Sequence, residues 1–296
     1  MNGASRTSVV AMLVAAELVI VGVGIYSLGF GYHPAFTMST EGSSAFVPRQ
    51  VQAVDAGLTP RVTIDDANSG IHVSVSNDGL VHVTDKTSFN GSWFGMNGAG
   101  YPQLQVTHDA SGVRITRANY DNDWFSGMSI QRVDVQVPSG AQLAITNAGL
   151  VDITGLNGGT ISAHCDDGHI EVRNLTTPSL ALSSDDGHID ATNLTLTGAS
   201  PWLKIATGDG HITASGLFPA GGTYDIASND GSVRLALDRG SNVTVNASTD
   251  DGDLRVNDSH NDTDNPSDTL RIGNGAAAMR VHSDDGSVAI ITNGAN

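Results

Sequence analysis

The chain has 296 residues and a formal net charge of −17 at pH 7, with 35 glycines and 31 acidic residues against 14 basic ones. The acidic residues are mostly aspartate, which favours turns and caps, so the composition excludes a mainly helical protein. Hydrophobic residues make up 39% and many are β-branched, so a turn-rich all-β fold with a core is predicted. The scattered basic residues also exclude nucleic acid as a partner, because no cluster of them could displace counterions from phosphates.

The first element in chain order is an apolar run from Val9 to Phe30, which contains one charged residue, Glu17. About 20 apolar residues span a bilayer. Arg6 precedes the run, which predicts that residues 1–8 form a short cytoplasmic tail and that the bulk of the chain is extracytoplasmic. No A-x-A-like cleavage site follows cleanly, which favours an uncleaved single-pass transmembrane anchor. The alternative is a cleaved signal peptide, which would leave a secreted protein.

After a polar linker at residues 31–50, residues 51–296 are predicted to form one domain built from an internal repeat. Each unit has a turn that ends in glycine and is followed by alternating apolar residues. The turn glycines are Gly79, Gly149, Gly168, Gly187, Gly210, Gly231, Gly252 and Gly286. Between Gly149 and Gly252 the successive spacings are 19, 19, 23, 21 and 21 residues, a period typical of solenoids.

Apolar residues lie two and four positions after each glycine, and seven and five positions before most of them, which predicts two half-buried strands per unit. One unit cannot close a core, but stacked units bury a continuous one. We therefore predict a parallel β-helix-like solenoid of about 20-residue coils, with Ile170 beside Ile189 beside Ile212. An antiparallel meander or sandwich is the alternative, because Asp-Gly also favours hairpins. At Gly79 and Gly149 the preceding apolar residues are displaced by one, which predicts a bulge or a different connection.

Two segments interrupt the repeat: an aromatic-rich insertion at residues 85–130 and an acidic, proline-containing loop at residues 258–268. Insertions in solenoids map to surface loops, often on the binding side. The aromatic insertion is interpreted either as a cap over the end of the first coil or as a binding surface for a glycan or an envelope protein. The candidate contact residues are Trp93, Phe94, Trp124 and Phe125.

Pairs of aspartates precede several turn glycines. Two carboxylates can carry out glycoside hydrolysis, so a polysaccharide-active β-helix is the enzymatic alternative. A catalytic pair should be singular, however, whereas these pairs recur at one turn position, where Asp next to Gly suits the turn itself. We therefore predict no catalytic residue and no cofactor. The pairs are Asp166 and Asp167, Asp185 and Asp186, Asp250 and Asp251, and Asp284 and Asp285.

Three histidines, His169, His188 and His211, directly follow the turn glycine in consecutive units. Stacking would bring their imidazoles together near aspartates, a combination that can hold a transition metal. The other units have no histidine at this position. The three residues are therefore minor metal candidates, the favoured interpretation is that they are solvated surface histidines, and no metal site is predicted.

The single cysteine, Cys165, lies three residues before Gly168, where the other units have serine or threonine. A small side chain that caps the turn is expected there. Cys165 is therefore predicted to replace a turn hydroxyl and not to act as a nucleophile.

An apolar N-terminal segment followed by repeated S-x-D-G-x-[IVL]-x-[VLA] units resembles the bacterial putative-adhesin domain family, a repetitive β-solenoid domain of unknown function. The likeness covers about Val51 to Ile291, and it implies an adhesion-type role without established catalytic residues. We expect a membrane-tethered, extracytoplasmic β-solenoid of the cell envelope that acts as an adhesion or scaffold module. The alternative is a polysaccharide-active hydrolase or lyase that uses the Asp pairs.

Overall fold

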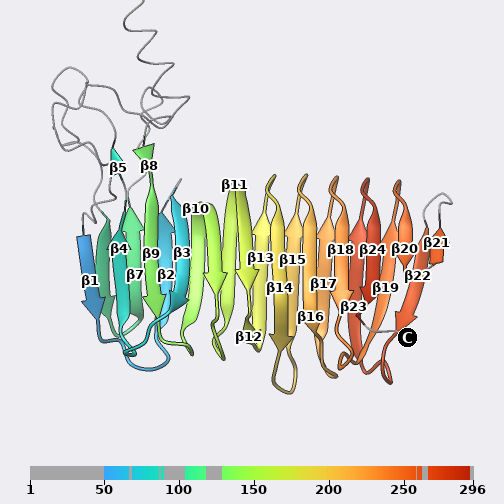
Figure 1. Cartoon of the computed structure of the whole chain (residues 1–296), viewed down its shortest axis with the longest axis horizontal. Helices are drawn as coiled ribbons and strands as arrows, with labels where there is room; N and C mark the ends of the chain where they lie inside the picture. The colour runs from blue at the N-terminus through green and yellow to red at the C-terminus, as the bar shows by residue number, and fades with distance from the viewer. Residues whose placement is uncertain are drawn as a thin grey trace, which may run out of the picture.

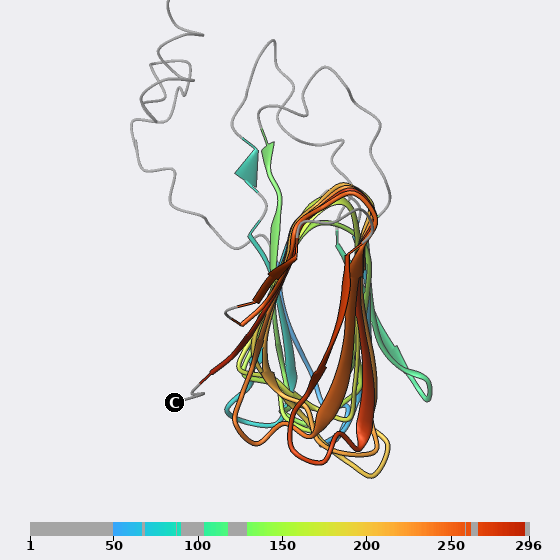
Figure 2. The same cartoon turned by 90° about the vertical axis from the view of Figure 1, so that its right-hand side faces the viewer.

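The computed structural model describes residues 50–66, 69–86, 88–89, 104–117, 129–257, 259–261 and 266–293. In these ranges the regular structure consists of strands, and 22 of them belong to one sheet. The sheet folds into two walls that face each other across a shared core and are joined at one edge by tight turns (Figures 1 and 2). The all-β prediction is confirmed.

Wall A contains the strand that precedes the turn in each coil. In spatial order it consists of β6 (Gln105–Asp109), β7 (Gly112–Arg117), β2 (Arg61–Asp66), the first half of β10 (Gln142–Thr154), the first half of β11 (Ile161–Arg173), β13 (Ser179–Ser184), β15 (Trp202–Thr207), β17 (Thr223–Ser228), β23 (Ala277–Ser283), β19 (Val243–Thr249) and β22 (Ser267–Arg271).

Wall B contains the strand that follows the turn. In spatial order it consists of β1 (Gln50–Val54), β4 (Val81–Asp85), β9 (Arg132–Val137), β3 (Gly70–Val75), the second halves of β10 and β11, β14 (Ile189–Leu196), β16 (Ile212–Leu217), β18 (Val233–Leu237), β24 (Val288–Thr292), β20 (Leu254–Val256) and β21 (Ser259–Asn261). The short β12 (Thr176–Thr177) pairs with β14, and β5 (Ser88–Phe89) pairs with β8 (Ser129–Ile130) in a separate sheet.

The strands of the repeat pair in parallel and in register. Ile170 lies beside Ile189, which lies beside Ile212, as predicted, and the antiparallel alternative is wrong for these coils. All three isoleucines point inward and are at most 1% exposed. Stacking like residues on like gives a single apolar cluster that runs through the whole sheet. Because each strand has only one apolar face, neighbouring coils bury that face only together.

The chain leaves wall B through a bend whose residues adopt a left-handed backbone. Gly155 has φ 77°, Asn174 has φ 55° and Asn193 has φ 54°. Asparagine and glycine tolerate this conformation best. The residue after each bend is a leucine that is at most 1% exposed, so the bend also contributes to the core. These leucines are Leu156, Leu175 and Leu194.

The units at Gly79 and Gly149, whose preceding apolar residues are displaced by one position, differ from the regular coils. One has a different connection and the other an irregular register, as the displacement predicts. The turn at Gly79 is differently connected: β4, which follows it, pairs antiparallel with β1 and β9. The coil that contains Gly149 has a register shift instead, and Ala148 pairs with Cys165. Thr146 was expected to hold the turn-hydroxyl position, but it is exposed and pairs with Asp65.

The coils do not stack in chain order at the C-terminal end. β23 lies between β17 and β19, and β24 lies between β18 and β20, so the last coil of the sequence inserts between the two coils that precede it in the chain (Figure 1). The segment 258–268 is predicted to be a surface loop. Where it is described, it instead contributes to β21 and β22, which pair antiparallel with the outermost coil and close the stack.

Part of the aromatic insertion builds the other end of the stack. β7 pairs in parallel with β2, and β6 pairs antiparallel with β7 as the edge of wall A. Trp93, Phe94, Trp124 and Phe125 lie outside the described residues, as does the predicted anchor at residues 9–30. Among the described residues, no helix has the length and apolar character that crossing a membrane requires.

Candidate functional site

The turns that join the two walls form a straight edge, which we call the turn edge (top of Figure 1). Its turn glycines stack directly on one another. A Cβ added to Gly187 would overlap the carbonyl oxygen of Gly168, and one added to Gly210 would overlap that of Gly187. Close approach of backbone to backbone thus requires glycine here. None of Gly168, Gly187 and Gly210 has a positive φ, so a left-handed turn residue is not the reason.

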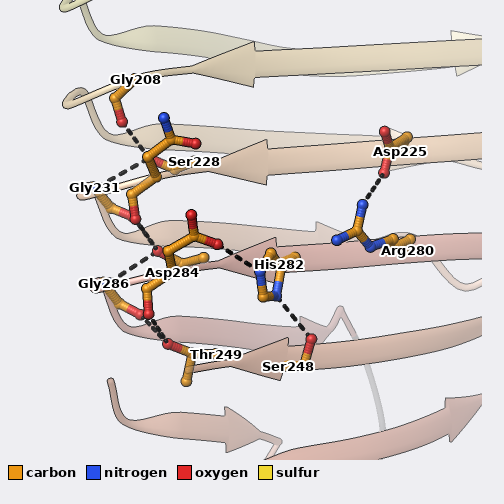
Figure 3. Close-up of polar contacts among 12 residues, drawn as sticks. Gly208, Asp225, Ser228, Gly231, Ser248, Thr249, Arg280, His282, Asp284 and Gly286 are labelled. Carbon is orange, nitrogen blue, oxygen red and sulfur yellow. Dashed lines mark hydrogen bonds and ion pairs between the residues drawn. The ribbon is translucent and has the colours of Figure 1, made fainter. Parts of the chain in front are cut away.

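A column of buried hydroxyls lies beside the stacked glycines (Figure 3). The Oγ of Ser228 accepts a hydrogen bond from the amide of Gly231 in its own turn, at 3.0 Å, and lies 3.0 Å from the carbonyl oxygen of Gly210 in the neighbouring coil. Ser283 makes the equivalent contacts with Gly286 and Gly231. One small side chain therefore serves polar groups of two coils, which accounts for the repeated serine or threonine.

Cys165 occupies this column, because it pairs in register with Ser184. Its side chain is fully buried. Burial, together with the nearby Asp166, raises the pKa of the thiol to about 12. The thiol is therefore protonated at neutral pH, as expected for a replaced turn hydroxyl and not for a nucleophile.

The paired aspartates lie on the solvent side of the turn edge, and all eight are exposed. The pKa of Asp186 is raised, chiefly by the negative charge of Asp209 in the adjacent coil and also by Asp167 and Asp185. The stacking of like turns thus creates a repulsive row of carboxylates. Such a row differs from the enclosed, water-poor surroundings that usually produce a catalytic acid.

The three predicted histidines are also at the turn edge, and two of them stack. The rings of His188 and His211 are 5.1 Å apart and nearly parallel. The Nδ1 atom of each accepts a backbone N–H from the next coil, His211 N at 3.2 Å and Ser232 N at 3.1 Å. His169 instead has its Nε2 atom 3.5 Å from Asp190. The three imidazoles therefore do not converge on one point.

Sequence reasoning missed two other histidines that lie among converging carboxylates. Within the described residues, two groups of three side chains place one potential ligand atom each within 4.8 Å of one another. One group is His164, Asp166 and Asp185, and the other is Asp250, His282 and Asp284. Both histidines lie four residues before a turn glycine, on the polar outer face of wall A.

The outer face of wall A also carries a shallow groove of about 420 Å³ around Trp202. Lys204, Asp225 and Arg280 lie along its floor in successive strands, with Arg280 3.8 Å from Asp225 (Figure 3). Trp202 is 39% exposed and is the one aromatic residue among the exposed large hydrophobic residues in the described part of the chain. A second, smaller depression lies on the other side of Trp202.

A buried ionic cluster lies at the N-terminal end of the stack. The guanidinium of Arg117 contacts Asp66 at 3.1 Å and Asp85 at 3.0 Å, and all three side chains are at most 4% exposed. Burial raises the pKa of Asp66, while Arg117 and the hydroxyl of Ser69 act in the opposite direction. The cluster joins strands β2, β7 and β4, and hence both walls.

Most of the chain matches a known protein family. Residues 61–291 match the family described as Toastrack DUF4097. Similar solved structures include a putative cell adhesion protein from Clostridium sporogenes ATCC 15579, with 9% identity and a TM-score of 0.38 over 83% of this chain and 100% of that one. Another is a putative adhesin from Bacteroides fragilis NCTC 9343, with 10% identity and a TM-score of 0.40 over 82% and 96% of the two chains.

No curated protein matches the chain. The resemblance to a putative-adhesin family, inferred from the repeat, is confirmed by the family match. The family match extends over well more than half of the sequence, from the first coil to the last. The chain therefore belongs to the Toastrack DUF4097 family.

Proposed function

We propose that the protein is a non-catalytic adhesion or scaffold module of the cell envelope. In this proposal residues 9–30 anchor the chain in the membrane and the β-solenoid is extracytoplasmic, where it binds a glycan through the groove at Trp202. The anchor is argued from the apolar run and from Arg6 before it. The groove is the observation that carries the binding role.

The chemistry of the groove supports a polar, ring-shaped ligand. The side chain of Trp202 is 39% exposed, and an aromatic ring can pack against the apolar face of a sugar ring. Lys204, Asp225 and Arg280 supply donors and acceptors beside it. These groups extend over neighbouring parallel strands, so the ligand would lie across several coils and not in a closed pocket.

The carboxylates support a role without catalysis. The Asp pairs repeat along an exposed edge, and none of the eight lines either of the two grooves beside Trp202. Glycoside hydrolysis requires two carboxyl groups that flank one bond of a bound substrate. Among the described residues, the Asp pairs form a row of equivalent carboxylates on an open surface, without a groove that would hold a substrate bond between two of them.

Binding can be tested with the detergent-solubilised full chain on an array of envelope and plant polysaccharides. We expect saturable binding to at least one polysaccharide and a loss of at least tenfold in affinity for Trp202→Ala. Leu58→Ala is the matched control, because Leu58 is 78% exposed but lies outside the groove. Equal binding by both variants, or none by the parent, contradicts the proposed binding role.

The remaining parts of the proposal need two further measurements. Protease added to intact cells should remove a C-terminal epitope tag, which tests the extracytoplasmic location. Without protease, the full chain should stay in the membrane fraction after a carbonate wash, which tests the anchor. The full chain should release no reducing sugar from the same polysaccharides. Hydrolysis that Asp185→Asn and Asp186→Asn together abolish would favour the enzymatic alternative instead.

A further inference from the structure

Two side-chain clusters on the outer face of wall A have the same composition. The first contains His282 and Asp284 from one coil and Asp250 from the adjacent coil. The second contains His164 and Asp166 from one coil and Asp185 from the adjacent coil. Each cluster combines one imidazole with two carboxylates, and the three ligand atoms lie within 4.8 Å of one another.

Both clusters come from the same positions of the repeat. In each, one coil supplies a histidine four residues before the turn glycine and an aspartate two residues before it. The adjacent coil supplies a serine and an aspartate at these same two positions. The sequences are His-Cys-Asp beside Ser-Ser-Asp at residues 164–166 and 183–185, and His-Ser-Asp beside Ser-Thr-Asp at residues 282–284 and 248–250.

In both clusters the serine holds the imidazole in one orientation. The Nδ1 atom of His282 is 2.9 Å from the Oγ of Ser248, and the Nε2 atom is 2.7 Å from Asp284 (Figure 3). The Nδ1 atom of His164 is 3.0 Å from the Oγ of Ser183, and its Nε2 atom is 3.4 Å from Asp166. A partner that fixes one ring nitrogen and directs the other at the ion is the usual outer contact of a metal-bound histidine.

The unusual coil order gives the second cluster the same arrangement as the first. In the sequence, the Ser-x-Asp coil at 248–250 precedes the His-x-Asp coil at 282–284, the reverse of the order at 164–185. Because β23 inserts between β17 and β19, the spatial order becomes the same in both places. The two coils that lie between the clusters have Ala206 and Gly208, and Ala227 and Asn229, at these positions, and so lack the ligands.

We propose that each cluster binds one divalent transition-metal ion of the Zn²⁺ type through the histidine Nε2 and the two carboxylates. Binding requires an Nε2 atom without a proton. A neutral imidazole then carries its single proton on Nδ1 and donates it to the serine Oγ, and an imidazolium first releases its Nε2 proton to solvent. A mixed nitrogen and oxygen ligand set suits Zn²⁺ better than Ca²⁺, which prefers oxygen ligands alone. A net charge of −17 further favours cations at this surface.

The cluster at His282 should bind more tightly than the one at His164. The side chain of His282 is 15% exposed, against 37% for His164, so less ordering is needed and water competes less. Its nitrogen also lies closer to the carboxylate of its own coil. Three protein ligands leave further positions for water, as in open zinc sites. This inference does not depend on the proposed glycan binding.

Calorimetric titration of the EDTA-treated full chain with ZnCl₂ tests the proposal. We expect two saturable sites, the loss of one in His282→Ala, the loss of the other in His164→Ala, and the loss of both in the double variant. Asp250→Asn and Asp185→Asn should weaken the same sites at least tenfold while keeping the turns intact. His211→Ala is the matched control, since that histidine lies on the turn edge outside both clusters, and it should retain both sites.

Several outcomes would overturn the assignment. The first is that the parent chain shows no saturable Zn²⁺ binding. The second is that the double variant His164→Ala with His282→Ala still binds two ions. The third is that His211→Ala loses a site. If Ca²⁺ binds the same sites as tightly as Zn²⁺, the clusters are an unselective acidic surface and not transition-metal sites. Melting of each metal-free variant, compared with the metal-free parent, distinguishes lost ligands from lost folding.

Discussion

At the scale of the residue, the turn glycines show how a correct pattern can rest on a different cause. The repeat predicts glycine at the turn, and an Asp-Gly turn commonly needs a positive φ. Here the backbone of Gly187 is not in that region, and the glycine is required because the carbonyl of Gly168 lies where a Cβ would be. The constraint comes from the neighbouring coil, about 20 residues away in the sequence, so no local turn rule contains it.

Replacing Gly187 with alanine should therefore destabilise the protein although the φ of Gly187 is not positive. The added methyl group must push two coils apart, and overpacking of this kind costs about 1–3 kcal/mol. Chemical denaturation would measure the loss. Gly70→Ala is the control, because a Cβ there meets its nearest neighbour, the carbonyl oxygen of Gln131, at an ordinary 3.5 Å. Equal unfolding free energies for the two variants would refute the close-approach explanation.

The two histidine clusters show what a residue-by-residue analysis of the sequence leaves out. His169, His188 and His211 attract attention because they follow the turn glycine in consecutive units. His164 and His282 lie in non-adjacent units and look like ordinary polar residues of an outward face. Their shared position four residues before the glycine is visible in the sequence, and so is the aspartate two residues later. The second carboxylate of each cluster comes from the adjacent coil, which the sequence of one unit does not show.

At the scale of the element, period-2 alternation predicts the strands of the regular coils and their register, because a one-residue slip would expose every buried side chain. In the two irregular units the alternation shows only that the apolar residues before the glycine are displaced by one position. It does not show which structure results. At Gly149 the displacement is a shorter turn in which Ala148 takes the hydroxyl position. At Gly79 it marks a strand, β4, that leaves the coil pattern and pairs antiparallel.

At the N-terminal end of the stack, the buried cluster of Asp66, Arg117 and Asp85 occupies the place where the regular coils have a turn hydroxyl. Asp66 lies two residues after Ile64, as Cys165 lies two residues after Ala163, so the hydroxyl column ends at a carboxylate. Its partner, Arg117, pairs in register with it from the next strand. A buried charge requires a compensating one, so the cluster fixes which strand can close this end.

Arg117→Ala should be strongly destabilising, because it leaves Asp66 and Asp85 buried without their shared cation. Breaking a buried pair in this way costs about 3–5 kcal/mol. Arg114→Ala, on the same strand, is the matched control: Arg114 is 64% exposed and lies 3.9 Å from Asp65, and a surface pair of this kind contributes about 0–1 kcal/mol. Urea unfolding of both variants compares the two, and a similar loss for each would mean that the buried cluster has no special role.

At the scale of the whole molecule, the repeat predicts that coils stack, but it contains no information about the order in which they stack. Each coil offers its neighbours the same apolar columns, so any coil fits beside any other. The exchange at the C-terminal end follows from the long connection through β21 and β22, which the sequence shows only as a 34-residue step from Gly252 to Gly286. The connection pairs with the outer coil and covers its exposed edge, as a solenoid end requires.

Paired cysteines would test this order directly. Asp225 pairs with Arg280, and Arg280 with Asn246, so Asp225 and Asn246 lie two strands apart. Adjacent strands are about 4.8 Å apart, within the range that a disulfide bridges, whereas two spacings exceed it. Asp225→Cys with Arg280→Cys should therefore oxidise readily, and Asp225→Cys with Asn246→Cys should not. Cys165 does not compete, since it is buried and its thiol pKa is raised to about 12. If the coils instead stacked in chain order, the second pair would form the disulfide and the first would not.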